Sequence, residues 1–557
     1  MLISITCFAQ EQKAIQIKSA GGYDRNEERF PDSDILSSKG GTRVHLFHEG
    51  VDVWSDRAIF KRKDNFFRAY GNVILKQGDT VTMNSAYVEY DGDTKMAISR
   101  ENVRLQTPEQ TLTTDTLYFD RNIQQAYYNN KGVVRDSATT LTSDKGRYFM
   151  ESKKYQFVSD VEVVNPEYTL NSAQLDYYTT SKHAYMYGPS TIVGAEYDIY
   201  CERGFYNTVS ENGFFVKNST INYNNREIKG DSLYFDNPTN FASATNNIKI
   251  TDTINNSIIR GHYAEIYKAK DSAFITKRAV AINLIEKDSM YIHGDILMVT
   301  GPEDDRIIRG FKNVKFYKQD MSGKCDSIHV NQKTGLTQLI RRPILWSGEN
   351  QMTGDTIHLI SDVKTEKLDS LKVINNSFVI QKDSLSENGY NQIKGLNLYG
   401  KFEDNELRTV DVIKNTEVIY YMYSDDDEFI GIDKTVCSKI NFVIGDEGIE
   451  DMTFFTQPDG DIYPDSELPK NARRLRGFVW YGDERIRTKD DIFDEDDNNI
   501  KLPTIYGVDQ PFDFESTNDE TDPDKAPALP IKKDEKGFLE KQKRLKSRSD
   551  LKRKKEQ

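Results

Sequence analysis

The sequence predicts an all-β fold: an elongated, solenoid-like stack of antiparallel strands in two facing sheets, followed by a disordered C-terminal tail. Tyr (31 residues) and Phe (28) are plentiful, Pro (15) is scarce, and hydrophobic residues make up only 37% of the chain. This composition has many strand formers and thin cores. No apolar period of 3.6 residues is sustained before residue 460. A repeat of about 29 residues favours one array over several domains.

The repeat is clearest in two segments of nearly identical sequence. Asp115-Thr-Leu-Tyr-Phe-Asp120 recurs as Asp231-Ser-Leu-Tyr-Phe-Asp236, and the offset of 116 residues is four steps of 29. Each step between them finds an apolar residue in the same slot, namely Leu112, Leu141, Leu170, Ile199 and Ile228. Polar stretches such as Asp91-Gly-Asp-Thr94 have turn compositions and separate the β-rich runs. Each unit therefore holds two strand-like halves, and the array is expected to span residues 42–456.

Within one half of the unit, the apolar residues switch from even to odd residue numbers. Leu112 has an even number, whereas Leu117 and Phe119 have odd numbers. Because side chains alternate between the two faces of a strand, a bend or bulge near Asp115 is needed to give all three a common face. We expect the same corner at Asp144 and Asp231, where an Asp can accept backbone hydrogen bonds; this structural role is favoured over catalysis.

The same argument identifies the side chains that should face the interior between the two sheets. They are Leu112, Leu117, Phe119, Leu141, Leu170, Leu175, Ile199, Ile228, Leu233 and Phe235. The residues alone leave two alternatives open: these side chains line a space for a ligand, or they close on one another as a dry core.

The segments outside the array have different compositions. Residues 1–9 are a short apolar run ending at Ala9, as in the tail of a secretory signal peptide, with a frayed terminus as the alternative; residues 10–41 are an N-terminal extension. Prolines end the repeat, so residues 457–489 are interpreted as a capping segment in which Gly477–Tyr481 adds a final strand. Residues 490–557 turn acidic and then basic, which predicts disorder.

Composition and motifs exclude several classes of function. A net charge of −14 disfavours nucleic acid as a partner. The sequence has no Cys-x-x-Cys pair, no His-x-x-x-His spacing, no glycine-rich phosphate loop and no nucleophile elbow, so neither a metal nor a cofactor is expected. A β-helical polysaccharide-cleaving enzyme, which needs a close pair of carboxylates, is the least favoured function, and no enzymatic activity is expected.

One recurring motif resembles a known family. Phe67-Arg-Ala-Tyr-Gly-Asn-Val-Ile-Leu75 is followed by related segments at Ser99–Val103, Phe311–Val314 and Ile413–Val418. They resemble the OstA-like family, which includes the periplasmic lipopolysaccharide-transport bridge protein and the N-terminal domain of its outer-membrane partner. The resemblance implies a β-jellyroll, open along one seam, whose apolar interior shields acyl chains while the sugar part of the lipid stays wet.

The resemblance also implies partners and a location. The partners would be lipopolysaccharide and the inner- and outer-membrane lipopolysaccharide-transport components. The location would be the periplasm, with association to the outer membrane as a further option. Exposed terminal strands add an expectation of edge-to-edge self-association. The alternative function is a structural or adhesive β-solenoid that acts through protein partners, and it predicts a filled interior.

Overall fold

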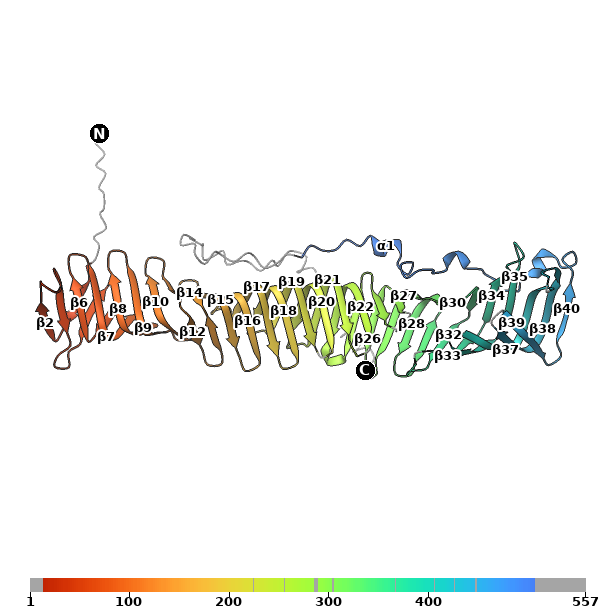
Figure 1. Ribbon diagram of the computed structural model, residues 1–557, viewed down its shortest axis with the longest axis horizontal. Helices are drawn as coiled ribbons and strands as arrows, with labels where there is room; N and C mark the ends of the chain where they lie inside the picture. The colour runs from red at the N-terminus through yellow and green to blue at the C-terminus, as the bar shows by residue number, and fades with distance from the viewer. Residues whose placement is uncertain are drawn as a thin grey trace, which may run out of the picture. The chain divides into compact units, whose positions relative to one another are not determined.

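The computed structural model describes residues 14–505, except residues 224, 255, 285–288, 303–304, 366, 405, 425 and 446–447. In this part of the chain 40 strands pair antiparallel, and the predicted class, all-β with strands in two facing sheets, is confirmed. The chain divides into unit 1 (residues 1–217 with 505–557) and unit 2 (residues 218–504). In both units successive strands lie side by side (Figure 1).

The strands of unit 1 are short or bent. They are β1 (Gln16–Ser19), β2 (Gly22–Arg25), β3 (Asp34–Ser37), β4 (Val44–His48), β5 (Val51–Ser55), β6 (Arg57–Lys61), β7 (Phe66–Gln77), β8 (Val81–Asp91), β9 (Met96–Gln106), β10 (Thr111–Asp120), β11 (Gln125–Tyr128), β12 (Gly132–Arg135), β13 (Thr140–Ser143), β14 (Lys145–Phe149), β15 (Lys154–Val164), β16 (Tyr168–Tyr178), β17 (His183–Gly194), β18 (Tyr197–Asn207) and β19 (Asn212–Tyr223). The boundary between the units lies within β19.

Unit 2 continues in the same style. Its strands are β20 (Arg226–Asp236), β21 (Phe241–Asp252), β22 (Ser257–Tyr267), β23 (Ser272–Thr276), β24 (Val280–Asn283), β25 (Met290–His293), β26 (Ile296–Thr300), β27 (Ile307–Lys318), β28 (Met321–Asn331), β29 (Leu336–Ile340), β30 (Ile344–Ser347), β31 (Asn350–Thr353), β32 (Thr356–Ser361), β33 (Leu368–Ile374), β34 (Ser377–Lys382), β35 (Tyr390–Gly395), β36 (Asn397–Glu403), β37 (Glu406–Tyr423), β38 (Phe429–Gly445), β39 (Gly448–Phe455) and β40 (Asp459–Tyr463). Two 3-10 turns, η2 (Lys470–Arg473) and η3 (Gly482–Glu484), and one α-helical turn, α1 (Glu495–Asn498), follow.

Each rung of the array is one bent strand or two short strands in line. β7 pairs with β6 through its first half and with β5 through its second half. β22 does the same with β24 and β23. The two halves of every rung belong to different walls. Within unit 1, wall A contains β4, β5, β12 and β13, and wall B contains β3, β6, β11 and β14. Within unit 2, wall A contains β24, β25, β30, β31, β34 and β35, and wall B contains β23, β26, β29, β32, β33 and β36.

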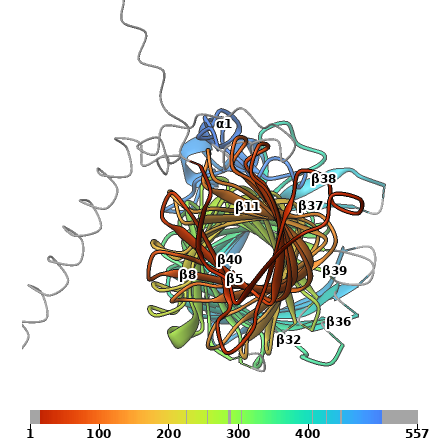
Figure 2. The ribbon, with the colours of Figure 1, turned by 90° about the vertical axis from the view of Figure 1, so that its left-hand side faces the viewer.

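Figure 2 shows the strands of unit 1 end on, in red to brown, wrapped around the interior between the walls. In unit 2 one apolar cluster joins the two walls. Ile275 and Leu339 come from wall B and pack in the same cluster as Ala281 and Leu345 from wall A. The core is therefore the space between the walls, as the alternation of apolar residues requires.

Turns and corners connect these rungs. The Asp91 carboxylate accepts the backbone N–H groups of Asp93 and Thr94, which fixes the turn predicted there. At the corners, two consecutive residues adopt left-handed backbone conformations, for example Gly71–Asn72 and Lys312–Asn313. The Asn-Val motifs thus mark corners, because Asn tolerates this conformation better than most residues.

The array starts earlier than the predicted boundary at residue 42, because β1, β2 and β3 already pair with β4, β3 and β6. Beyond β40 the chain forms no strand up to residue 505, so the strand expected at Gly477–Tyr481 is absent. The signal-peptide prediction for residues 1–9 and most of the predicted disordered tail lie outside the described residues. No helix in the described part of the chain is both long and apolar enough to cross a membrane.

Candidate functional site: the interior and its rim

The ten residues predicted to face the interior are mostly buried. The nine that expose 8% or less of their surface are Leu112, Leu117, Phe119, Leu141, Leu170, Leu175, Ile199, Ile228 and Leu233. The tenth, Phe235, is half-buried on β20.

Wall A of unit 1 carries a continuous ladder of aliphatic side chains. Leu112 lies opposite Leu105 and Val134, and Val134 lies opposite Leu141. The pairing continues through Val163, Leu170, Ile192 and Ile199. Paired positions on neighbouring strands bring their side chains into contact on one face, so these residues form one apolar track along the interior.

The parity change along β10 separates its apolar residues between the walls. The pairing register of β10 with β9 shifts between Thr114 and Thr116, and Asp115 lies in the gap. Leu112 therefore belongs to wall A, whereas Leu117 and Phe119 belong to wall B. The bend of the rung at Asp115 lets all three side chains be buried.

The other two predicted corner residues make specific contacts at their corners. The Asp144 N–H donates to the Ser159 carbonyl (3.0 Å), and the Asp144 carboxylate accepts from the Ser159 hydroxyl (2.9 Å). The Asp231 carboxylate accepts from the Asn247 side chain (2.9 Å). Ser159 and Asn247 are themselves left-handed. The carboxylates thus accept hydrogen bonds from side chains of the next rung, where backbone donors were expected.

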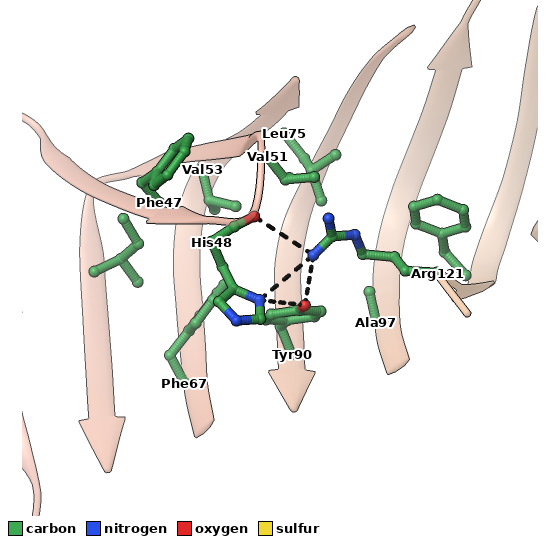
Figure 3. Close-up of a pocket in the computed structure, with 11 residues that line it drawn as sticks. Phe47, His48, Val51, Val53, Phe67, Leu75, Tyr90, Ala97 and Arg121 are labelled. Carbon is green, nitrogen blue, oxygen red and sulfur yellow. Dashed lines mark hydrogen bonds between the residues drawn. The ribbon is translucent and has the colours of Figure 1, made fainter. Parts of the chain in front are cut away.

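The edge opposite the corners, here called the rim, has no covalent link between the walls. In unit 1 it is bridged by side chains from hairpin turns. Arg121, in a wall B turn, donates to the carbonyl of Glu49 in a wall A turn (2.9 Å) and to the Tyr90 hydroxyl (2.7 Å). The Tyr90 hydroxyl also meets His48 Nδ1 (2.7 Å). Figure 3 shows the contacts that join Arg121, Tyr90 and His48.

Further contacts cross the same rim. Lys95 forms an ion pair with Glu49 (2.8 Å). The Gln77 side chain donates to that of Gln124 (3.2 Å). Together with Arg121, Tyr90 and His48, these residues form what we call the rim clasp. Its residues lie up to 73 positions apart in the sequence, so no local motif relates Arg121 to His48 or to Glu49.

The interior next to the rim clasp is almost filled. Leu46, Val53, Phe67 and Phe119 from both walls line a cavity of about 10 Å³ there, roughly the room that one water molecule needs. Burial raises the pKa of Tyr90 above its usual value. In this state the walls touch, so any larger apolar guest must separate them.

Two cysteine side chains are buried in the array. Burial raises the pKa of the Cys201 and Cys325 thiols to about 12, so both are protonated and weakly nucleophilic near neutral pH. Among the described residues, no group of three or more His, Cys, Asp or Glu side chains is placed to hold a metal ion.

Comparison with known proteins identifies part of the array. Residues 12–173 match the family model of OstA-like protein. A similar solved chain is LptH, the LptA homologous periplasmic component of the conserved lipopolysaccharide transport device from Pseudomonas aeruginosa. The match covers 19% of this chain and 81% of LptH, with 15% sequence identity and a TM-score of 0.18. No curated protein matches the chain. The resemblance inferred from the Asn-Val motifs is confirmed: residues 12–173 form an OstA-like domain.

Proposed function

We propose that the protein is a non-enzymatic, periplasmic lipid-binding bridge that shields lipopolysaccharide acyl chains between its walls on the way to the outer membrane. One observation carries the proposal: a continuous aliphatic interior is closed on one side by covalent corners and on the other only by side-chain contacts. The OstA-like domain supports the same assignment, because it includes the ladder from Leu105 to Leu170.

The physical advantage of such an interior is large. Each buried methylene of an acyl chain is stabilised by about 0.8 kcal/mol, so acyl chains do not cross water unaided at a useful rate. A track of aliphatic side chains from rung to rung removes most of that barrier. Sugars attached to the lipid would remain outside the rim, in water.

The small cavity beside the rim clasp means that this function requires the walls to open. Since the cavity at the rim clasp holds about 10 Å³, the walls must part at the rim before an acyl chain enters. The corners act as the hinge, because each rung is continuous or closely bridged there, as at Asp144 and Ser159. Opening would break the rim contacts and leave strand pairing within each wall intact.

Photo-crosslinking tests the proposal directly. A photoreactive amino acid at Leu170 faces the interior, whereas the same group at the neighbouring exposed Asn171 faces outward. Leu141 and Thr142 form a second such pair on β13. Adducts with lipopolysaccharide are expected at Leu170 and Leu141 and not at their neighbours. Equal labelling within each pair, or no adduct at any interior position, would contradict the proposal.

The small cavity beside the rim clasp also favours a second candidate, a structural β-solenoid that acts through protein partners. This alternative needs no opening of the walls. Its prediction is a chain that binds no lipopolysaccharide and keeps the rim closed under all conditions. The same crosslinking experiment therefore separates the two functions.

The terminal strands suggest partners for either function. Among the described residues, β1 and β2 at the start of unit 1 and β39 and β40 at the end of unit 2 each pair with one strand only. Phe455 on β39 and Ile462 on β40 are 41% and 54% exposed. We expect these edges to pair with like-folded transport components or with a second copy. Size measurements over a concentration series test self-association, and a strict monomer would exclude it.

A further inference from the structure

The segment after β40 crosses the outer face of wall A in unit 2. We call residues 468–493 the strap; Figure 1 shows this part of the chain in blue, leading to α1. Among the described residues, the backbone hydrogen bonds of the strap outside regular strands are all internal turns, such as Phe478 N–H to Leu475 C=O. The strap is therefore held on the wall by side chains.

Two glutamine side chains on the wall bind the strap backbone in the same way. Gln392 on β35 donates to the Arg473 carbonyl (2.9 Å) and accepts the Leu475 N–H (2.8 Å). Gln351 on β31 donates to the Val479 carbonyl (2.8 Å) and accepts the Tyr481 N–H (2.7 Å). Both glutamines are fully buried, at 0% exposure.

Each carboxamide thus spans residues i and i+2 of the strap, taking the place that a neighbouring peptide group would occupy. The residues between are Arg474 and Trp480. Both contact Tyr390 on the wall: the Arg474 guanidinium lies 4.3 Å from its ring centroid, and the Trp480 ring 5.4 Å. Phe478 packs on Tyr390 as well, at 5.2 Å.

Apolar anchors and cations complete the contact. Leu468 and Leu475 are 5% exposed and pack against Ile380, Tyr421 and Ile432 of the wall. Lys394 donates to the Arg476 carbonyl (3.1 Å). These wall residues point away from the interior, because their neighbours along the same strands, Ile393 and Val418, pack in the inner cluster.

We propose that this outer face is a binding site for a peptide of the type Arg-x-x-x-Phe-x-Trp that turns between its Arg and Phe, occupied here by residues 468–481 of the same chain. Gln351, Tyr390 and Gln392 form the recognition centre. The contacts, and not the covalent connection to β40, hold the strap in place. The site is separate from the interior and independent of what the interior binds.

The test uses the full chain with protease recognition sequences inserted at residues 464–467 and at residues 482–484, because Ile486 and Ile492 hold the later part of the chain on Val280 and Ile282. After cleavage, the strap fragment is expected to stay bound during gel filtration and to exchange slowly with a labelled peptide of residues 466–483. Before cleavage the peptide should not enter, since the tethered strap is present at a high effective concentration. Immediate loss of the fragment on cleavage would overturn the proposal.

Variants locate the recognition centre. Gln392→Leu removes both backbone hydrogen bonds and should speed release of the cleaved strap about tenfold. Gln338→Leu, which changes a strand glutamine paired with His358 on wall B, should release at the parent rate. Release of the Gln392→Leu strap at the parent rate would refute the assignment.

Peptide variants keep the test independent of folding. A labelled peptide carrying Trp480→Ala should fail to replace the strap, whereas one carrying Val479→Ala should succeed, because Val479 is 48% exposed. Equal binding of the two peptides would contradict the proposal. Dimers of uncleaved chains that exchange straps would show the same recognition between copies and support it.

Discussion

Replacing Arg121 by Ala should loosen the rim clasp and leave the walls intact. The guanidinium donates across the rim to the Glu49 carbonyl at 2.9 Å, whereas its 2.7 Å bond to the Tyr90 hydroxyl lies within wall B. Hydrogen bonds from a charged donor are worth about 1.5–3 kcal/mol when buried. Because Arg121 is half-exposed, we assign about 1 kcal/mol to the bond that crosses the rim. Opening of the rim should therefore become easier by about 1 kcal/mol, which is roughly a fivefold increase in the open population.

The reaction of a buried cysteine with a thiol reagent measures this opening. A cysteine at Leu46, which is 1% exposed and lines the interior beside the rim clasp, should react about fivefold faster in Arg121→Ala, while a cysteine at buried Leu175 on β16 keeps its parent rate. Arg104→Ala removes an exposed arginine from β9 and serves as the matched control. If the two variants react alike, the clasp does not hold the walls together and the reasoning fails.

Three further changes test the packing, a buried phenol and a corner. Leu233→Ala should lower the free energy of unfolding of unit 2 by about 2–5 kcal/mol in chemical denaturation, whereas exposed Leu385→Ala should change it little; similar losses would contradict a packed interior. Burial raises the pKa of Tyr128 to about 12, so the stabilisation by its neutral phenol is present below pH 10 and is lost as the pH rises through 12. The parent protein should therefore lose stability relative to Tyr128→Phe between pH 10 and 12. Parallel pH profiles of the two proteins would refute this. Asn247→Val places a β-branched residue at a φ of 50° and should lower stability by about 1–3 kcal/mol in thermal unfolding, and an unchanged melting temperature would exclude a strained corner.

The sequence alone indicates the two walls because its apolar residues depart from the alternation of a straight strand at the same point of each unit. Leu112 and Leu117 would lie on opposite faces of a straight strand, and only a bend lets both side chains face the interior. The bend near Asp115 follows from that rule, and the register shift in β10 is its structural form. The burial of Leu117 and Leu233, each 1% exposed, follows from the same alternation.

The rim clasp and the strap depend on contacts that no local pattern carries. Arg121 and Glu49 are brought together by several antiparallel rungs, so neither residue is distinctive in sequence. Gly477–Tyr481 has the apolar composition of a strand, yet it forms none, because Gln351 satisfies its backbone through a side chain. The Asn-Val motifs lie at left-handed corners, which the backbone angles show and the sequence pattern alone does not.

The separation of the walls at the rim of unit 1 tests the account most directly. Spin labels at Asp79→Cys and Ile123→Cys would sit on turns of opposite walls beside the Gln77–Gln124 contact. Cys201, Cys325 and Cys437 are buried and should stay unlabelled, and Cys7 is replaced by Ser so that it takes no label. We expect the distance between the labels to grow by several ångströms when lipopolysaccharide binds, while a pair of labels within one wall stays fixed. An unchanged distance in protein that has bound lipopolysaccharide would show that acyl chains do not enter between the walls.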